Sequence, residues 1–146
     1  MRILVTLMFL TIVFQDGSSS IFNFKKEKST SKWYVVNDGV MGGLSQSVIL
    51  INDSGNGLFK GYVTTENNGG FSSVRHSFRK KVVSEFEQIV LKVKGDGKTY
   101  QFRIKEKLSQ RFSYTTTFQT TGEWEIIKIP FDSFYPSFRG YNLNIP

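Results

Sequence analysis

The feature that most constrains the fold is a pair of alternating segments, residues 88–94 and 98–105, on either side of a Gly-Asp-Gly-Lys turn. Alternation with a period of two is typical of half-buried β-strands. An Asp-Gly pair supplies the positive φ that a tight hairpin turn requires. We therefore predict an antiparallel hairpin with one shared, buried face, formed by Ile89, Leu91, Val93, Tyr100, Phe102 and Ile104.

Six other segments have the pattern or composition of strands. They are residues 33–36, 45–51, 57–64, 71–78, 111–118 and 123–129. No segment has sustained helical periodicity, and residues 81–87 allow one helical turn at most. Eight evenly spaced strands in 146 residues predict one all-β domain, an antiparallel β-sandwich or jelly roll, with an immunoglobulin-type sandwich as the alternative.

Composition excludes several kinds of catalytic site. The chain has no cysteine, which removes disulfides, thiolate metal sites and cysteine nucleophiles. Its one histidine, His76, excludes sites built on two histidines, and we expect it to be structural or on the surface. Neither paired carboxylates nor a nucleophile with its base occur at a convincing spacing. We therefore expect a protein that is not an enzyme and that holds no metal or cofactor.

The amino terminus has the pattern of a targeting signal. Arg2 is followed by twelve uncharged residues, 3–14, and then by the small residues 17–20. This stretch is shorter than the roughly 20 residues of a membrane-spanning helix, but it suits the apolar core of a secretory signal. We predict a signal peptide or membrane-targeting leader in residues 1–20, and a protein exported to or associated with the periplasmic or extracellular side. A first β-strand in a cytoplasmic protein is the alternative.

Four motifs are more specific than strand periodicity requires. Trp33 is followed by Asn-Asp-Gly-Val-Met-Gly-Gly-Leu-Ser at residues 37–45, by Asn-Asn-Gly-Gly-Phe at 67–71 and by Gly-Asp-Gly-Lys-Thr-Tyr at 95–100. In kind and order, these motifs closely resemble the complex I intermediate-associated protein 30 family, a family of NADH:ubiquinone oxidoreductase assembly factors. The resemblance extends over about residues 22–139.

The resemblance implies a galactose-binding-like jelly roll that works by binding and not by catalysis. Eukaryotic members help assemble mitochondrial NADH:ubiquinone oxidoreductase and act as chaperone-like proteins. This short chain with a secretory-type start looks like the small bacterial members. The family domain usually continues past the Arg-Gly pair at residues 139–140, so we expect residues 21–146 to be either a short β-sandwich domain or one truncated at its C-terminal end.

The first candidate binding residues lie in turns. Asp38, beside Asn37, could bind a cation or a sugar hydroxyl, and the amides of Asn67 and Asn68 suit sugar hydroxyls or a peptide backbone. The alternative is purely structural, because Asn and Asp bond their own backbone in turns. Met41 is unusual in a solvent loop, so we expect it either to close the end of the core or to offer a soft contact to a partner.

Basic side chains form the second candidate surface. On the outward face of the predicted hairpin we expect four cations, Lys92, Lys94, Arg103 and Lys105. Arg103 has the fork geometry to contact a carboxylate of an acidic partner; a solvated basic face without a partner is the alternative. Arg75 and Arg139, inside the family-like motifs, are further candidates.

The function that these observations favour is binding to a protein partner in a respiratory or other membrane complex. A carbohydrate-binding module is the alternative, since the sandwich class, the 15% aromatic residues and the Asn-rich turns also suit sugars. The formal net charge of +7 fits an acidic protein, an anionic lipid headgroup or nucleic acid. The pattern argues against nucleic acid as the partner, because no basic tract or single-strand motif accompanies the charge.

Overall fold

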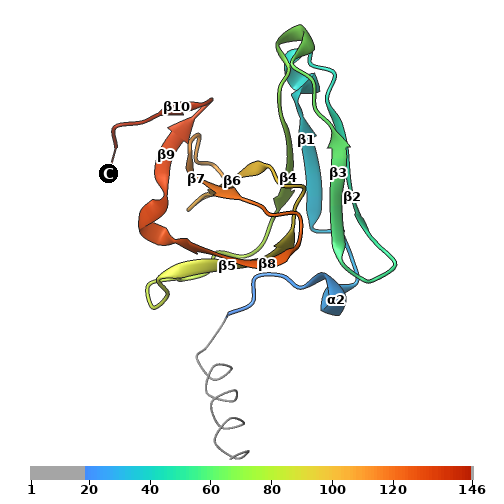
Figure 1. The fold of residues 1–146 in the computed structure, drawn as a ribbon. Coiled ribbons are helices and arrows are strands. Elements are labelled where there is room, and N and C mark those ends of the chain that lie inside the picture. The colour runs from blue at the N-terminus through green and yellow to red at the C-terminus, as the bar shows by residue number, and fades with distance from the viewer. Residues whose placement is uncertain (1–18, 146) are drawn as a thin grey trace, which may run out of the picture. The chain divides into compact units, whose positions relative to one another are not determined.

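A computed structural model describes residues 19–145, so nearly all of the predicted leader lies outside the described residues. The described chain contains ten strands, a four-residue helix α2 (Phe24–Glu27) and three short 3-10 helices. It divides into two compact units with a boundary after Arg79. Unit 1 is described from residue 19 to 79 and unit 2 from residue 80 to 145 (Figure 1).

Unit 1 is built from two antiparallel strand pairs. Its strands are β1 (Trp33–Asn37), β2 (Gln46–Ile51), β3 (Gly57–Tyr62) and β4 (Ser72–His76). β1 pairs with β4 and β2 pairs with β3. The connection after β1 contains η1 (Asp38–Met41), and the connection after β3 contains η2 (Glu66–Asn68). Because Asn37 lies opposite Ser72, both connections meet at one end of the unit, which we call the tip (residues 38–45 and 63–71; Figure 1).

Unit 2 contains the other six strands. They are β5 (Gln88–Lys94), β6 (Thr99–Ile104), β7 (Ser113–Gln119), β8 (Trp124–Pro130), β9 (Tyr135–Phe138) and β10 (Tyr141–Asn142), with η3 (Phe131–Ser133) between β8 and β9. β5 pairs with β8, and the remaining four form an antiparallel sheet in the order β10-β9-β7-β6.

The predicted all-β, antiparallel fold of the sandwich class is confirmed. A strand occupies each of the eight predicted positions, and residues 81–87 form no helix. The sequence does not reveal β9 and β10. Pro136 lies within β9, where it cannot donate a hydrogen bond to the ladder, and β10 has only two residues.

The predicted hairpin of β5 and β6 is wrong. β5 pairs with β8 and β6 pairs with β7, so the Gly-Asp-Gly-Lys turn carries the chain from one sheet of unit 2 to the other. The six apolar residues assigned to one face therefore divide between two sheets. Within each strand the alternation is confirmed, since Leu91 and Phe102 are half-buried while Lys92 and Arg103 are exposed.

Thr120, in the β7–β8 connection, explains why this turn does not close a hairpin. Its hydroxyl accepts a bond from Gly97 N at 3.1 Å and donates one to Lys98 O at 2.9 Å. Its amide also donates to Lys98 O, at 3.1 Å. The backbone groups at the turn are thus bonded to a second chain reversal that crosses between the same two sheets. Local turn chemistry did not distinguish the two arrangements.

The remaining side chains of this motif support the same crossing. The hydroxyl of Tyr100 donates to Asp96 at 2.6 Å, and Lys98 forms an ion pair with Asp96. Hydrogen bonds from Lys98 and Tyr100 lower the pKa of Asp96 to about 2. Burial and the neighbouring carboxylate of Asp96 raise the pKa of Tyr100 to about 12. Asp96, Lys98 and Tyr100 thus form a local network of hydrogen bonds and an ion pair at the crossing.

The most deeply buried side chains of the described part of the chain are mainly polar. Ile129 is its one buried hydrophobic residue, whereas the buried polar residues are Asp38, Ser45, Thr115, Thr116, Thr120 and Ser137. Thr115 and Ser137 share a hydrogen bond at 2.7 Å in unit 2. In unit 1, Phe22, Phe24, Trp33, His76 and Phe78 form an aromatic cluster.

Candidate binding site at the tip of unit 1

Asp38 is the anchor of the tip. Its side chain has no exposed surface, and its Oδ1 accepts a hydrogen bond from Ser45 N at 3.0 Å. Its Oδ2 accepts from Ser45 Oγ, from Gly70 N at 2.7 Å and from Phe71 N at 3.3 Å. One carboxylate therefore joins the connection after β1 to the connection before β4. This favours the structural alternative for Asp38 over a cation or sugar ligand.

These hydrogen-bond donors stabilise the ionised form of Asp38. Burial by itself raises the pKa of a carboxyl group, because water no longer solvates the charge. Here the hydrogen bonds from Ser45, Gly70 and Phe71 outweigh burial, so the pKa of Asp38 lies below its usual value. The ionised form is therefore the one that the tip is built around.

Two glycines of the family-like motifs are required by this carboxylate. A Cβ on Gly43 would lie 2.3 Å from the carboxyl carbon of Asp38. A Cβ on Gly69 would lie 2.6 Å from Oδ2 of Asp38 and 2.8 Å from the carbonyl oxygen of Thr64. The glycines thus let the backbone close around Asp38. Their place in the motifs is explained by this lack of space for a Cβ, and not by backbone flexibility alone.

The three asparagines of the candidate site also have structural roles. Oδ1 of Asn37 accepts from Ser47 Oγ at 2.9 Å and from Ser72 Oγ at 2.8 Å, which connects β1, β2 and β4. Asn67 and Asn68 are exposed and have φ of 53° and 60°, in the left-handed region that Asn tolerates better than most residues. Both amides lie on the tip, where solvent reaches them.

The tip presents apolar side chains to solvent. Val40, Met41 and Leu44 expose 79%, 62% and 52% of their surface. Tyr62, Val63 and Phe71, which flank them at the ends of β3 and β4, are also exposed. Met41 does not close the core, so of its two predicted roles the structure favours contact with a partner.

The basic surface predicted on one hairpin face is not formed. Lys92 and Lys94 lie on β5, Arg103 lies on β6, and these strands belong to different sheets. Lys105 follows β6 and donates to Gln110 O at 2.9 Å, while Arg103 donates to Gln101 Oε1 at 2.6 Å. The prediction failed because it depended on the pairing of β5 with β6.

Arg75 and Arg139 are not among the tip residues, and each contacts a side chain close to it in the sequence. Arg75 is exposed on β4 and donates from Nε to Ser73 Oγ at 3.3 Å. Arg139, with φ of 50°, places its guanidinium 5.3 Å from the ring centre of Phe138. The structure therefore places four of the predicted site residues in the tip, Asp38, Met41, Asn67 and Asn68, and Asn37 next to it at the end of β1.

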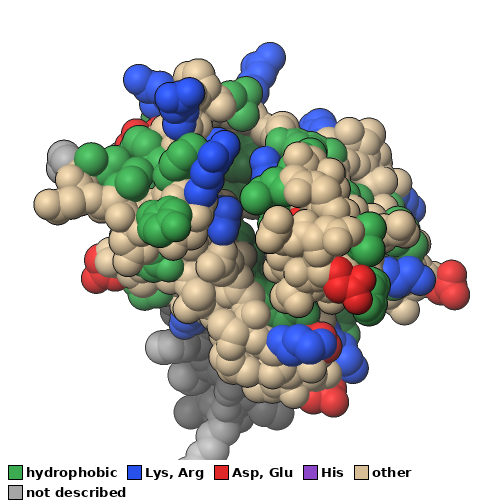
Figure 2. All heavy atoms as spheres, turned by 90° about the horizontal axis from the view of Figure 1, so that it is seen from above, with side chains coloured by type: hydrophobic (Ala, Val, Ile, Leu, Met, Phe, Trp, Pro, Cys, Tyr) green, Lys and Arg blue, Asp and Glu red, His purple; other side chains and the backbone are tan. Residues whose placement is uncertain are grey.

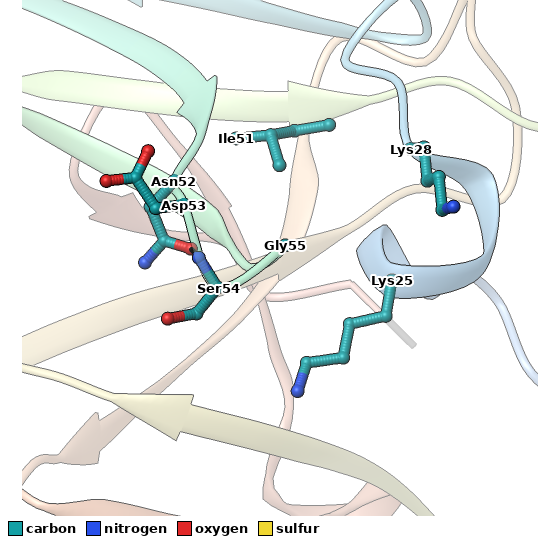
Figure 3. Close-up of a pocket in the computed structure, with 7 residues that line it drawn as sticks. All are labelled: Lys25, Lys28, Ile51, Asn52, Asp53, Ser54 and Gly55. Atoms are coloured by element: carbon teal, nitrogen blue, oxygen red, sulfur yellow. Dashed lines mark hydrogen bonds between the residues drawn. The ribbon is translucent and has the colours of Figure 1, made fainter.

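Other surface features do not converge on a site. A depression of about 530 Å³ beside α2 is lined by Lys25, Lys28 and residues 51–55 (Figure 3). The amide of Asn52 is used within its own turn, since its Oδ1 accepts from Ser54 N and Asn56 N. In residues 19–145, no group of three or more His, Asp or Glu side chains could hold a metal ion. None of the helices in that range is long and apolar enough to cross a membrane.

His76 predicts a pH response of unit 1. Its ring stacks on that of Trp33, with the two ring centres 4.6 Å apart. Within the described chain, neither ring nitrogen of His76 has a hydrogen-bond partner. Burial and nearby Lys32 lower the pKa of His76 below its usual 6.5, although Glu27 acts in the opposite direction. The neutral ring is thus favoured in the fold, so the folded protein loses stability as pH falls below about 6.5.

We expect the melting temperature to fall from pH 7.5 to 5, and to fall less in His76→Phe. Equal dependence of the melting temperature on pH in the two proteins would contradict this role of His76.

Sequence reasoning missed the apolar residues that accompany Met41. Val40 and Leu44 read as parts of a turn motif, and Tyr62, Val63 and Phe71 read as strand residues. The available signal was the concentration of large apolar side chains in a loop rich in glycine, which Met41 alone had indicated. Their convergence depends on Asp38, which joins connections more than 30 residues apart in the chain.

Comparison with known proteins gives a match along most of the chain. The family described as Complex I intermediate-associated protein 30 matches residues 22–145. The mitochondrial protein of that name from Drosophila melanogaster is 29% identical over 152 residues, covering 88% of this chain and 51% of the relative. The one from Mus musculus is 23% identical over 150 residues, covering 88% and 46%. The chain thus spans about half the length of these curated relatives.

A third relative has a shorter match. The probable complex I intermediate-associated protein 30, mitochondrial, of Caenorhabditis elegans is 30% identical over 119 residues. That match covers 67% of this chain and 35% of the relative. All of the motifs that carry the resemblance lie within the residues that the family matches.

Proposed function

The chain belongs to the complex I intermediate-associated protein 30 family, and from that premise we propose that it is a non-enzymatic binding domain that assists the assembly of a respiratory complex. Its relatives are named as complex I intermediate-associated proteins. In the finer form of the proposal, the domain holds an incompletely assembled subunit, as a chaperone does. We further propose an exported or membrane-associated location, directed by residues 1–20.

The observation that carries this proposal is the apolar tip. Val40, Met41 and Leu44 are exposed although Asp38 fixes the backbone beneath them. An apolar surface that is already ordered loses little conformational entropy when a partner covers it. Exposed apolar groups gathered in this way mark interaction sites on soluble domains. Among the charged residues only Glu66 lies in the exposed part of the tip, so we propose an apolar protein surface as its partner.

Affinity capture tests the proposed function directly. The tagged full-length chain is expressed in its own cells, crosslinked and recovered from the membrane fraction, and the captured proteins are identified by mass spectrometry. Respiratory-complex subunits should be enriched over a tag-only control. Recovery of unrelated proteins at the same level from both samples would contradict the proposal. Amino-terminal sequencing of the same material shows whether the leader is removed.

The tip residues should be needed for capture but not for folding. We expect Val40→Ser with Met41→Ser to reduce partner binding roughly tenfold or more, since truncation of the few central side chains that dominate an interface costs over about 1 kcal/mol each. Because both side chains are exposed, the melting temperature should stay within a few degrees. The matched control is Tyr34→Ser with Val48→Ser, which removes two exposed apolar side chains of unit 1 away from the tip. Equal loss in both double variants would argue against the tip as the binding surface.

Carbohydrate binding is the second candidate, and exposed Trp124 favours it. Half of the surface of this side chain is accessible, and an exposed aromatic ring can stack on a sugar face. A glycan array probed with the protein and with Trp124→Ala tests this function. A glycan bound by the protein and lost in the variant would support it, whereas an array without bound glycans would count against it.

A further inference from the structure

The β5–β8 sheet has one face on which each cation lies opposite a large apolar side chain. Val90 lies opposite Lys128, Lys92 opposite Ile126, and Lys94 opposite Trp124. Directly opposed residues of an antiparallel pair point to the same face. We call these six residues the lysine–tryptophan face. Its lysines are exposed, and Val90, Trp124 and Ile126 expose 54%, 50% and 56% of their surface.

Acidic groups do not neutralise this face as a whole. Glu125 points to the other side of the sheet, where its Oε1 accepts from Thr121 N at 2.7 Å. Glu123 forms an ion pair with Lys94 at 3.5 Å, at the end of β8. Of the three lysines, only Lys94 has an ion pair in the described part of the chain. The face therefore keeps a net positive charge beside its apolar groups.

We propose that the lysine–tryptophan face docks on an anionic lipid surface. A lysine can lay its aliphatic stem over an apolar neighbour and extend its ammonium group toward a charged boundary. Trp is enriched at the boundary between water and lipid, where its ring is buried and its N–H stays hydrated. Each lysine of this face stands opposite an apolar residue, so the sheet offers both kinds of contact over its whole length. The net charge of +7 attracts the chain to the same surface.

The identity of the cations favours lipid over an acidic protein. All three cations of the face are lysines, which act as point charges, and none is an arginine with a fork that fits a single carboxylate. A membrane presents many interchangeable headgroups, for which point charges suffice. Figure 2 shows Lys and Arg side chains beside exposed hydrophobic side chains on the side of the molecule that it draws. On the face of β5 and β8, each lysine is paired across the strands with an apolar residue.

Vesicle binding by the full-length chain tests this proposal. Sedimentation is measured with vesicles of phosphatidylglycerol and phosphatidylcholine in equal parts, and with phosphatidylcholine alone, so that any effect of residues 1–18 is common to all variants. Lys92→Gln with Lys128→Gln should weaken binding to the anionic vesicles roughly 30-fold at low salt, about fivefold for each lysine. Binding to the neutral vesicles should change little.

The matched control is Arg103→Gln with Lys105→Gln, which removes the same charge from β6 and the residue after its end. This control should lose much less affinity; equal losses in both double variants would show that only net charge matters and would overturn the proposal. The fluorescence of Trp124 gives an independent reading, since its emission should shift to the blue on anionic vesicles and the shift should disappear in Trp124→Phe. Absence of the shift, together with tighter binding to an acidic peptide than to vesicles, would assign the face to a protein partner instead.

Discussion

Asp38→Asn is expected to lower the melting temperature by on the order of 10 °C, because at least one donor around this buried carboxylate loses its acceptor. Every group that bonds the two carboxylate oxygens is a donor: the amides of Ser45, Gly70 and Phe71, and the hydroxyl of Ser45. An asparagine keeps one acceptor oxygen and turns an NH₂ group toward at least one of these donors. Thermal unfolding followed by circular dichroism measures the loss.

The control for Asp38 is Asp53→Asn, an exposed carboxyl in the β2–β3 turn of the same unit, which should change the melting temperature by only a few degrees. The pH dependence gives a second check. Since the pKa of Asp38 is lowered in the fold, its charge stabilises the protein above about the usual value of 3.8, and this is lost as pH falls through the lower folded pKa. Asp38→Asn should lose that part of the acid sensitivity. A variant as stable as the original chain would contradict the anchoring role.

Gly95→Val should destabilise unit 2 by roughly 3 kcal/mol. Even a single Cβ at this position would lie 2.3 Å from Oγ1 and 2.4 Å from Cβ of Thr120. Thr120 is buried and bonded to Gly97 and Lys98, so it cannot move aside without breaking the crossing between the sheets. Urea unfolding measures this change in the free energy of unfolding, provided that the m value is the same for the variant and the original chain.

The comparison variant for Gly95 is Gly97→Ala. Gly97 has φ of 82°, and no atom lies within 4 Å of the position that its Cβ would take. Its cost is therefore backbone strain alone, about 1 kcal/mol. If β5 and β6 formed a simple hairpin, Gly95 would face no buried threonine, and the two variants would reverse in order. The pair of measurements thus separates a crossing between sheets from a hairpin.

The sequence by itself determined the positions of eight of the ten strands and which side chains of its clearest alternating segments face inward. Alternation in residues 88–94 and 98–105 depends on the two-residue repeat of a strand, which is local, and the structure shows the expected inward and outward residues. The Trp, Asn-Asp-Gly and Asn-Asn-Gly motifs indicated the family in the same way, since a motif can be recognised without knowing its contacts.

Only the tertiary structure decided which strands pair and what each motif does. The turn at residues 95–98 is compatible with a hairpin, and contact with distant Thr120 selects a crossing instead. Likewise Asp38 resembles a turn residue or a ligand until Gly70 and Phe71, more than 30 positions away, are seen to donate to it. Burial and hydrogen bonding depend on neighbours in space, and residues 92, 94, 103 and 105 could not be assigned to one surface before their partner strands were known.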